Sequence, residues 1–316
     1  MTPTDLPDTP RRLRHLISLE HLSAAQILHL LDRAEQMRAQ WLADRHSLNL
    51  LSGRAVVNLF FENSTRTRTS FDLAAKRLGA DVINFDIASS STSKGESLVD
   101  TLHTLEAMHC DAFVVRHKEN GTAEFLARHV RGAASVINAG DGNNAHPTQG
   151  LLDAFTIRRQ RPDFAALRVL ICGDILHSRV ARSDIHALRT LGVGSLRVCA
   201  PANLLPAQHE LPGCEIVEDF DTALDGVDAI IMLRLQKERM QQAQVPSEQA
   251  YYARYGLDAR RLRLARPDCL VMHPGPINRE VEIASAVADG AQSAILEQVS
   301  NGVFVRMAVL AELLGA

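Results

Sequence analysis

The sequence predicts an α/β protein of two domains, each a parallel sheet flanked by helices on both faces, with helices bridging the two. Three observations support this fold class. Short apolar runs alternate with amphipathic stretches along the chain, which is typical of parallel strands joined by helices. The 316 residues fit two domains of roughly 100–200 residues each. A helical stretch that begins at Pro147 falls mid-chain and would connect the two units.

Regular structure in the first half is expected to begin after Ser23. Ser23 and Gln26 have the spacing of a capping box, so a helix should start there. Its expected buried stripe is Ile27, Leu28, Leu31 and Ala34. Further helices are expected over residues 70–78, ending at Gly79, around Leu98, and over 123–130. The expected strands are residues 55–61, 81–87, 111–116 and 134–138.

The second half repeats the alternation. Strands are expected over residues 168–172, 195–199, 215–217, 228–233 and 269–273, with a helix near 180–191. The last segment, residues 291–314, is strongly apolar at helical spacing. We therefore expect one domain over residues 1–147 and a second over 148–295. A final helix, about residues 296–316, would pack back on the first domain.

Composition and charge disfavour several classes of function. Charged residues make up 22% of the chain, the net charge is -3, and Lys and Arg are scattered, so neither nucleic acid nor a membrane surface is an expected partner. No apolar run has membrane-spanning length, and no apolar leader follows Met1. The five cysteines form no Cys-x-x-Cys pair, which favours buried, reduced thiols and a cytoplasmic location.

Basic and hydroxyl side chains follow several of the expected strands. Residues 64–68 come after the first strand, and Arg116 ends the third. In the second half Arg234 directly follows one strand and His273 ends another. Ligands of open parallel sheets bind beyond the carboxyl ends of the strands. We therefore expect these groups to converge on one site for a multiply anionic ligand.

The segment Ser64-Thr65-Arg66-Thr67 is the most informative of these. It lies between an expected strand and an expected helix, where backbone N–H groups of a helix start bind anions. Its hydroxyl groups and one guanidinium add donors suited to phosphate oxygens. An ordinary helix cap with a solvated arginine uses the same residue types, so the segment alone leaves that alternative open.

Other residues suit the same chemistry. His146 precedes a helix start, where a neutral imidazole can donate one hydrogen bond to a polarised carbonyl, and Gln149 fits a planar amide. Lys94 ends a serine-rich run that could close over an anion. Arg179 and Arg234 could grip two carboxylates. Each has an ordinary alternative: a capping histidine, an exposed linker, or surface arginines.

Motifs of several other enzyme classes are absent from the sequence. It contains no Gly-x-x-x-x-Gly-Lys-Ser/Thr loop and no Gly-x-Gly-x-x-Gly after a strand, which disfavours a nucleotide enzyme. The 13 histidines show no His-Glu-x-x-His and no metal-ligand spacing with cysteine, and no Gly-x-Ser-x-Gly elbow is present.

An ordered set of motifs resembles the aspartate/ornithine carbamoyltransferase family over nearly the whole chain. The motifs are residues 60–71 (Phe-Phe-Glu-Asn-Ser-Thr-Arg-Thr-Arg-Thr-Ser-Phe), 93–97 (Ser-Lys-Gly-Glu-Ser), 115–117 (Val-Arg-His), 146–149 (His-Pro-Thr-Gln) and 273–276 (His-Pro-Gly-Pro). Asn63 stands where many members have Pro. In the second half, residues 173–179 and 232–239 resemble members that act on aspartate. The His-Cys-Leu-Pro and Ser-Met-Gly segments typical of ornithine enzymes are missing.

The resemblance implies carbamoyl transfer from carbamoyl phosphate to the α-amine of L-aspartate, the committed step of de novo pyrimidine biosynthesis, without cofactor or metal. The phosphate would be held by Ser64, Thr65, Arg66, Thr67 and Arg116. The carbonyl would be polarised by Thr67, Arg116 and His146, and the carbamoyl NH2 would contact Gln149 and the Pro274 carbonyl, in the loop with Gly275 and Pro276. L-Aspartate would bind Lys94, Arg179, Arg234 and Gln236. Glu62 is expected to pair with an arginine across the domains.

The family also implies a homotrimer whose sites lie between subunits. Ser90 and Lys94 would then enter the neighbouring site, although Ser89 and Ser91 are alternatives to Ser90. A larger assembly with a dihydroorotase-like or regulatory chain is possible by the same resemblance. Two other functions stay open: carbamoyl transfer to a different amino acid, and a non-catalytic chain of the same fold. The second is disfavoured because Arg66, Arg116, His146 and Lys94 are all present.

Overall fold

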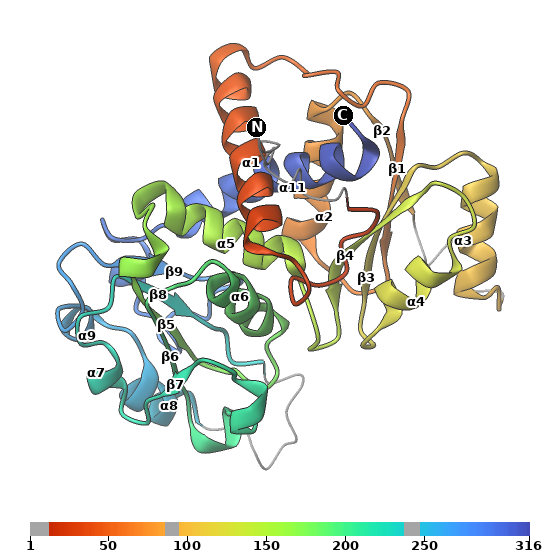
Figure 1. Cartoon of the computed structure of the whole chain (residues 1–316). Coiled ribbons are helices and arrows are strands. Elements are labelled where there is room, and N and C mark those ends of the chain that lie inside the picture. Colours follow the sequence, from red (N-terminus) through yellow and green to blue (C-terminus); the bar gives the residue numbers. More distant parts are fainter. Residues whose placement is uncertain (1–12, 86–94, 237–246) are drawn as a thin grey trace, which may run out of the picture.

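The computed structural model describes residues 13–85, 95–236 and 247–316, which form two parallel sheets with helices around them (Figure 1). The first sheet has the strand order β2-β1-β3-β4. Its strands are β1 (Ala55–Phe60), β2 (Asp81–Phe85), β3 (Ala112–His117) and β4 (Ser135–Asp141). All its neighbouring strands pair in parallel, as the strand-helix alternation predicted.

Helices cover both faces of the first sheet because its strands are buried on both sides. Val56 and Val114 point to one face and share a core with α1 and α2, whereas Val57 and Phe113 point to the other and pack with residues of α3 and α4. These helices are α1 (Ala24–Asp44), α2 (Thr65–Arg77), α3 (Leu98–Ala107) and α4 (Thr122–His129). Figure 1 shows the sheet between the two helix pairs.

The second sheet has the strand order β7-β6-β5-β8-β9, and its strands are also parallel. Its strands are β5 (Arg168–Cys172), β6 (Ser195–Cys199), β7 (Glu215–Ile216), β8 (Ala229–Met232) and β9 (Leu270–Met272). The surrounding helices are α6 (Arg179–Thr190), α7 (Phe220–Ala223), α8 (Glu248–Tyr255), α9 (Ala259–Leu262) and α10 (Ser285–Ala288), with short 3-10 turns at Phe164–Ala166, Ala202–Leu204 and Gln208–Glu210.

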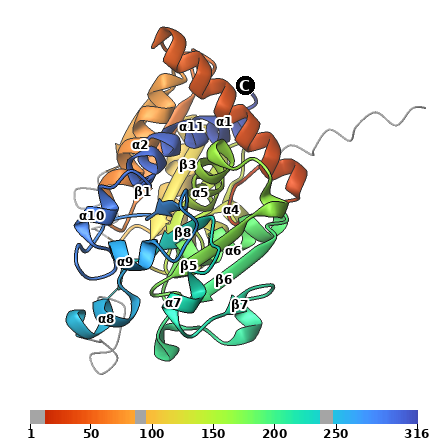
Figure 2. The same cartoon turned by 90° about the vertical axis from the view of Figure 1, so that its left-hand side faces the viewer.

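Two helices join the halves: α5 (Pro147–Gln160) and α11 (Ile295–Leu314). α5 runs between the two sheets and packs on α6, α11 and β4 (Figures 1 and 2). α11 leaves the second half and packs on α1 and α2 as well as α5. Both helices are buried on nearly all sides, so one apolar core continues from the first sheet to the second. Within the described residues, no helix combines the length and apolarity needed to span a bilayer.

Several local predictions are confirmed and two are wrong. Ser23 caps α1 in a complete capping box with Gln26, and all five cysteines are free and buried. Leu28, however, is 38% exposed, and the stripe of α1 is completed by Leu30 and Met37. The helix expected over residues 70–78 begins five residues earlier, at Thr65, because Ser64 is its N-cap. Other ends differ by a residue or a few, and the four short helices α7, α8, α9 and α10 were not predicted.

Candidate functional site

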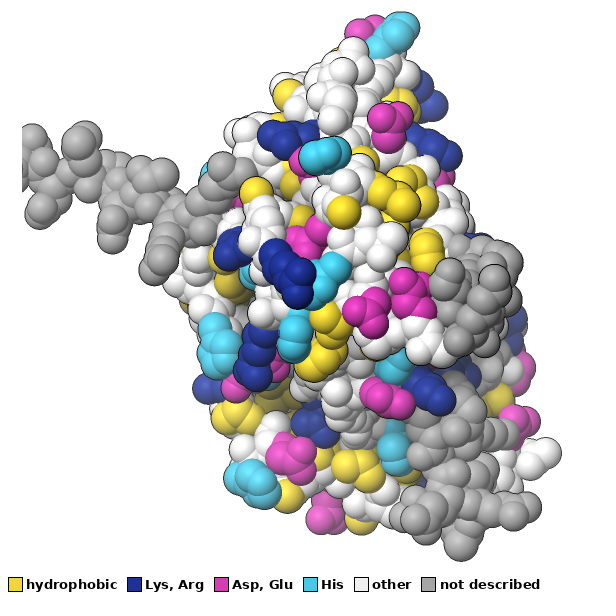
Figure 3. Space-filling view, turned by 90° about the vertical axis from the view of Figure 1, so that its right-hand side faces the viewer, with side chains coloured by type: hydrophobic (Ala, Val, Ile, Leu, Met, Phe, Trp, Pro, Cys, Tyr) yellow, Lys and Arg dark blue, Asp and Glu magenta, His cyan; other side chains and the backbone are white. Residues whose placement is uncertain are grey.

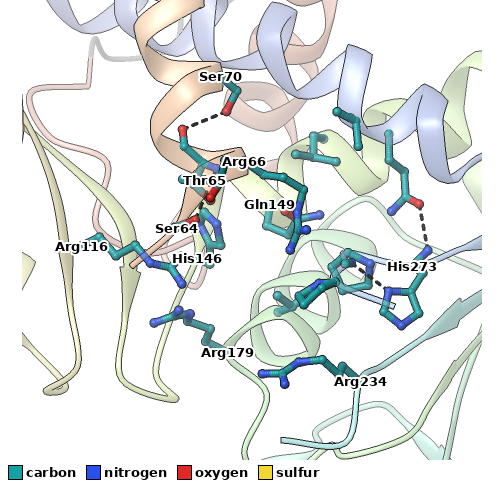
Figure 4. A pocket seen from close by; sticks show the side chains of 18 of the residues that line it. Ser64, Thr65, Arg66, Ser70, Arg116, His146, Gln149, Arg179, Arg234 and His273 are labelled. Atoms are coloured by element: carbon teal, nitrogen blue, oxygen red, sulfur yellow. Dashed lines mark hydrogen bonds between the residues drawn. The ribbon is translucent and has the colours of Figure 1, made fainter. Parts of the chain in front are cut away.

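A cavity of about 520 Å³ opens at the carboxyl ends of strands from both sheets (Figure 4). It is lined by every predicted site residue that the structure describes: Ser64, Thr65, Arg66, Thr67, Arg116, His146, Gln149, Arg179, Arg234, Gln236, Pro274, Gly275 and Pro276. Ser90 and Lys94, with the alternatives Ser89 and Ser91, lie outside the described residues. Among the described lining residues Glu62 is the only carboxylate, whereas several are arginines.

The start of α2 forms one wall of this cavity. The Ser64 Oγ accepts a hydrogen bond from the Thr67 backbone N–H at 3.3 Å, which fixes the first turn. Thr65, Arg66 and Thr67 are therefore first-turn residues, whose backbone N–H groups have no acceptor within the helix. The turn thus presents backbone donors, hydroxyl groups and one guanidinium to the same space, as an anion site requires.

Arg66 crosses the cavity toward the second half. A Cβ on Gly275 would lie 3.0 Å from the Arg66 Cζ, so the guanidinium rests against the loop after β9. Burial, with a smaller contribution from the nearby charge of Arg234, lowers the pKa of Arg66. An arginine remains charged after such a shift, so the two cations face a common space and favour an anion between them.

Glu62 links the two halves, as expected, through Arg179. Its carboxylate accepts a hydrogen bond from Arg179 Nη2 at 2.9 Å and lies 3.4 Å from Arg116 Nε. Both arginines also donate to backbone carbonyls, Arg116 to Ala139 and Arg179 to that of residue 142. In Figure 4 the two guanidinium groups lie close together.

Gly140, a residue that sequence reasoning did not single out, allows this approach of two guanidinium groups. Its φ is +120°, and a Cβ would lie 3.0 Å from Arg116 Nη1 and from Arg179 Cζ. A side chain there would be strained by its backbone conformation and would push both cations away. The pair of arginines therefore depends on a glycine between them.

His146 is buried and lines the cavity at the start of α5. Burial, followed by the charges of Arg116, Arg179 and Arg306, holds the pKa of His146 well below its usual value. Its Nδ1 is buried and has no hydrogen-bond partner among the described residues. The imidazole is therefore neutral at physiological pH, and a neutral ring has a single N–H to donate.

Gln149 and the loop after β9 are each fixed by hydrogen bonds to other side chains. Gln149 Nε2 donates to both carboxylate oxygens of Asp153 at 3.1 Å. His273 Nδ1 accepts from the Gly275 N–H at 2.8 Å, and its Nε2 lies 3.2 Å from Glu282. Dashed lines at His273 in Figure 4 mark hydrogen bonds of this residue. These contacts fix the amide and the loop that the sequence assigned to the same ligand.

Arg234 and Gln236 reach the cavity from the segment after β8. The Gln236 backbone N–H donates to Asp174 at 3.2 Å, and its Nε2 donates to the His177 carbonyl at 3.0 Å. Asp174 also accepts from His177 Nδ1 at 2.8 Å. The loop before α6 therefore anchors the segment that carries Arg234.

Two polar residues of α11, Gln298 and Arg306, line the cavity but were missed by sequence reasoning. Gln298 Oε1 accepts from the His273 N–H at 2.9 Å, and its Nε2 donates to Asp153 at 2.7 Å. The Arg306 guanidinium lies over the Phe71 ring, and burial lowers its pKa to about 10. A signal was available: residues eight apart share a helix face, and both are polar within an apolar segment.

Comparison with known proteins gives a consistent result. Residues 14–159 match the "Aspartate/ornithine carbamoyltransferase, carbamoyl-P binding domain" family and residues 165–313 the "Asp/Orn binding domain" family. The chain is 58% identical over 309 residues to an aspartate carbamoyltransferase catalytic subunit of Xanthomonas campestris pv. campestris, covering 98% of each chain. A Stenotrophomonas maltophilia relative of the same name is 56% identical, again with 98% of each chain covered.

Solved structures of carbamoyltransferases have the same fold as this chain. The aspartate transcarbamoylase of Trypanosoma cruzi in complex with carbamoyl aspartate and phosphate has a TM-score of 0.86 at 34% identity, covering 95% of each chain. The ornithine carbamoyltransferase of Pyrococcus furiosus has a TM-score of 0.87 at 25% identity, covering 96% of this chain and 97% of that one. The near-equal scores show that the fold does not separate the two amino-acid substrates. The chain belongs to the aspartate/ornithine carbamoyltransferase family.

Proposed function

We propose that this enzyme transfers the carbamoyl group of carbamoyl phosphate to the α-amine of L-aspartate, giving N-carbamoyl-L-aspartate and phosphate in pyrimidine biosynthesis. One observation carries the proposal: the helix start at Ser64 and the guanidinium groups of Arg66, Arg116, Arg179 and Arg234 line a single cavity. Both substrates are multiply anionic, so a cavity with this charge can hold them side by side. Much of the rate would come from that positioning.

The carbamoyl phosphate would occupy the side of the cavity next to α2. The phosphate would accept hydrogen bonds from the first turn, from the hydroxyl groups of Ser64, Thr65 and Thr67, and from Arg66 and Arg116. The carbamoyl oxygen would face Thr67, Arg116 and His146, whose donors stabilise the oxyanion that develops during attack. A neutral His146 suits this role because it donates a hydrogen bond without carrying a charge.

The carbamoyl amino group would be bound by acceptors. Gln149 Nε2 is already engaged with Asp153, so its Oε1 is the atom left to accept from the carbamoyl NH2. The Pro274 carbonyl would accept the second N–H, in the loop that Gly275 and Pro276 complete. This pairing discriminates an NH2 from an oxygen at the same position.

L-Aspartate would bind on the side of the second sheet. Arg179 and Arg234 would hold its two carboxylates, with Gln236 orienting Arg234. Its α-amine would attack the carbamoyl carbon directly. The C–N bond forms as the C–O bond to phosphate breaks, and the departing phosphate accepts the proton from nitrogen. No covalent intermediate with the protein is required.

A different amino-acid acceptor is the alternative function, and Arg234 argues against the ornithine case. A cationic side chain would be repelled by Arg234, whereas a second carboxylate would be attracted. An amine-acceptor screen with carbamoyl phosphate tests this point. We expect carbamoylation of L-aspartate, no carbamoylation of L-ornithine, and inhibition by L-malate, which has both carboxylates but no amine. Carbamoylation of ornithine in preference to aspartate would overturn the assignment.

The domain division and the assembly complete the proposal. We propose that residues 1–147, with the last helix, form the carbamoyl-phosphate-binding domain and that residues 148–295 form the L-aspartate-binding domain. Gln149 and the loop at Pro274 would contact carbamoyl phosphate from the second domain. The homotrimer implied by the family would bring Ser90 and Lys94 into a neighbouring site. Met108, at the end of α3, is 67% exposed, and Phe125, in α4, is 45% exposed. Figure 3 views the molecule from the side on which Figure 1 shows these two helices. Such apolar side chains suit a subunit contact.

The shared site can be tested by mixing two inactive variants. Arg66→Ala and Lys94→Ala subunits, dissociated and reassembled together, should regain activity because some sites would then contain neither substitution. Reassembly of each variant alone is the control. If a mixture shown to contain hybrid trimers recovered no activity, the shared site would be excluded. A cytoplasmic location, and association with a dihydroorotase-like or regulatory chain, stay predictions.

A further inference from the structure

A pair of buried carboxyl groups lies directly behind the cavity. Asp153 is on α5 and Asp184 is on α6, and each is only 1% exposed. The two helices pack on each other, and the carboxyl groups lie close enough to influence each other's ionisation. Neither residue lines the cavity, so the reaction proposed above gives them no direct role.

The hydrogen-bond partners of the two carboxyl groups differ sharply. Asp153 accepts from Gln149 Nε2 at 3.1 Å and from Gln298 Nε2 at 2.7 Å. Among the described residues, neither side-chain oxygen of Asp184 has a hydrogen-bond partner. An ionised carboxylate without donors is very costly to bury, whereas a protonated carboxyl needs only one acceptor. The surroundings therefore suit an ionised Asp153 and a neutral Asp184.

Charge gives the same assignment. Two adjacent carboxylates cannot both be ionised at low cost in a dry interior, so such a pair holds one proton between them. Burial raises the pKa of Asp153 to about 6, while the hydrogen bonds from Gln298 and Gln149 and the charge of Arg306 oppose that rise and favour its ionised form. Burial, and next the charge of Asp153, raises the pKa of Asp184 well above its usual range. The two groups titrate as a pair.

We infer that Asp184 is a positioning residue, which shares one proton with Asp153 and thereby holds the Asp153 carboxylate against the amide of Gln149. This inference rests on the proposed function, because the role of Gln149 is to accept from the carbamoyl NH2. The Asp153 carboxylate takes the Gln149 NH2 and so fixes which end of that amide faces the substrate. Through Gln298 and His273 the same carboxylate is connected to the Gly275 loop on the other side of the substrate.

Two substitutions at Asp184 separate the shared proton from simple packing. In Asp184→Asn the amide NH2 donates to Asp153 without a titratable proton, so kcat/KM for carbamoyl phosphate should stay within about twofold of the wild type. In Asp184→Leu the donor is lost, and kcat/KM should fall about tenfold or more as Gln149 loses its fixed orientation. Asp228→Asn is the matched control. It alters a buried carboxyl at the amino ends of β5 and β8, where Asp228 accepts from the Arg168 N–H away from the cavity, and should leave kcat/KM unchanged.

The pH dependence of unfolding tests the proton without any activity assay. Because the folded pKa of Asp184 is raised, the folded chain holds a proton that the unfolded chain releases above its ordinary value of 3.8. Wild-type stability from this pair is therefore complete below pH 3.8 and declines as the pH rises toward the folded pKa. Asp184→Asn has no such proton, so its thermal midpoint relative to the wild type should increase steadily with pH.

The outcomes are distinct. A midpoint difference that does not change with pH, or a loss of kcat/KM in Asp184→Asn as large as in Asp184→Leu, would overturn the inference. If Asp184→Leu does not fold, the comparison of Asp184→Asn with the wild type still decides it. If the wild type forms no carbamoyl-aspartate, the proposed function fails, while the unfolding experiment still reports on the shared proton.

Discussion

On the side of the first sheet, consecutive residues of one helical turn, Thr65, Arg66 and Thr67, line the cavity, whereas the second sheet supplies Arg179 from α6 and Arg234 from the segment after β8. The first group is held by a local cap, in which Ser64 accepts from the Thr67 N–H. The second is held by long-range contacts, Arg179 by Glu62 and the Arg234 segment by Asp174. One side of the cavity is therefore held by local contacts, and the opposite side is held by tertiary contacts.

This difference has a consequence for function. The helix start is complete as soon as α2 forms, so the phosphate side should be ready before either substrate binds. The aspartate side depends on the relative position of the two sheets, because Glu62 follows β1 and Arg179 belongs to the second half. We therefore expect substitutions on the phosphate side to affect the chemical step, and those on the aspartate side to affect mainly amino-acid binding.

The largest expected effect is that of Arg66→Ala. Removal of one charged donor from a preorganised anion site typically lowers kcat by about 10²–10³-fold, and Arg66 is also placed against Gly275 and near Arg234. Steady-state assays of carbamoyl-aspartate formation measure the loss. Arg68→Ala is the control, since Arg68 belongs to the same helix but does not line the cavity. Equal losses in the two variants would show that the helix start has no special role.

Arg234→Ala should have a smaller effect, confined to aspartate. Loss of a bidentate carboxylate contact is expected to raise KM for L-aspartate by about 10–10²-fold and to leave that for carbamoyl phosphate nearly unchanged. Arg234→Lys should recover only part of the affinity, because an ammonium lacks the planar fork. Aspartate saturation that is normal in Arg234→Ala would show that the second carboxylate is bound elsewhere.

Much of the fold and the first side of the cavity could be predicted because their signals are local. Strand-helix alternation gave both parallel sheets, and the Ser64–Thr67 pattern identified the helix start, although the helix was expected to begin at residue 70. The Leu28 prediction failed because periodicity alone does not say how wide the buried stripe of a helix is.

The supporting residues could not be found in the same way. Asp153 lies one helical turn beyond Gln149, but only the fold brings Gln298 from α11 to the same carboxylate. From the sequence alone Asp184 is indistinguishable from a polar residue on the exposed face of a helix. Only the packing of α5 on α6 shows that it is buried. A single sequence does not indicate the role of Gly140. The position requires a glycine because Arg116 of β3 and Arg179 of α6 both lie against it in the folded chain.

Glu62→Gln probes the link between the two sides. The variant removes the negative charge that Arg116 and Arg179 share while keeping a side chain of the same shape. We expect a rise of about tenfold or less in KM for L-aspartate, since Arg179 loses its ion pair with Glu62 but keeps its hydrogen bond to the carbonyl of residue 142, also in the first half. Asp72→Asn, which removes a partner of Lys76 on α2 away from the cavity, is a control for loss of one carboxylate. An unchanged KM would show that Arg179 is positioned without Glu62.

The smallest expected effect concerns the pH profile of kcat/KM, in which the ionisation of one histidine should be absent. Burial and the charges of Arg116, Arg179 and Arg306 lower the pKa of His146 well below 6.5, so kcat/KM should show no ionisation of this histidine between pH 6 and 8.

The same shift in the pKa of His146 should affect stability. Near pH 6.5 this histidine becomes protonated in the unfolded chain but stays neutral in the folded chain. The stability contributed by neutral His146 is therefore complete above pH 6.5 and declines as the pH falls below it. Thermal unfolding from pH 5 to 8 should show this slope in the wild type and a shallower one in His146→Gln. Equal slopes in both proteins would mean that His146 binds its proton at the same pH in the folded and unfolded chains, so that the phosphate side of the cavity would gain a cation below pH 6.5.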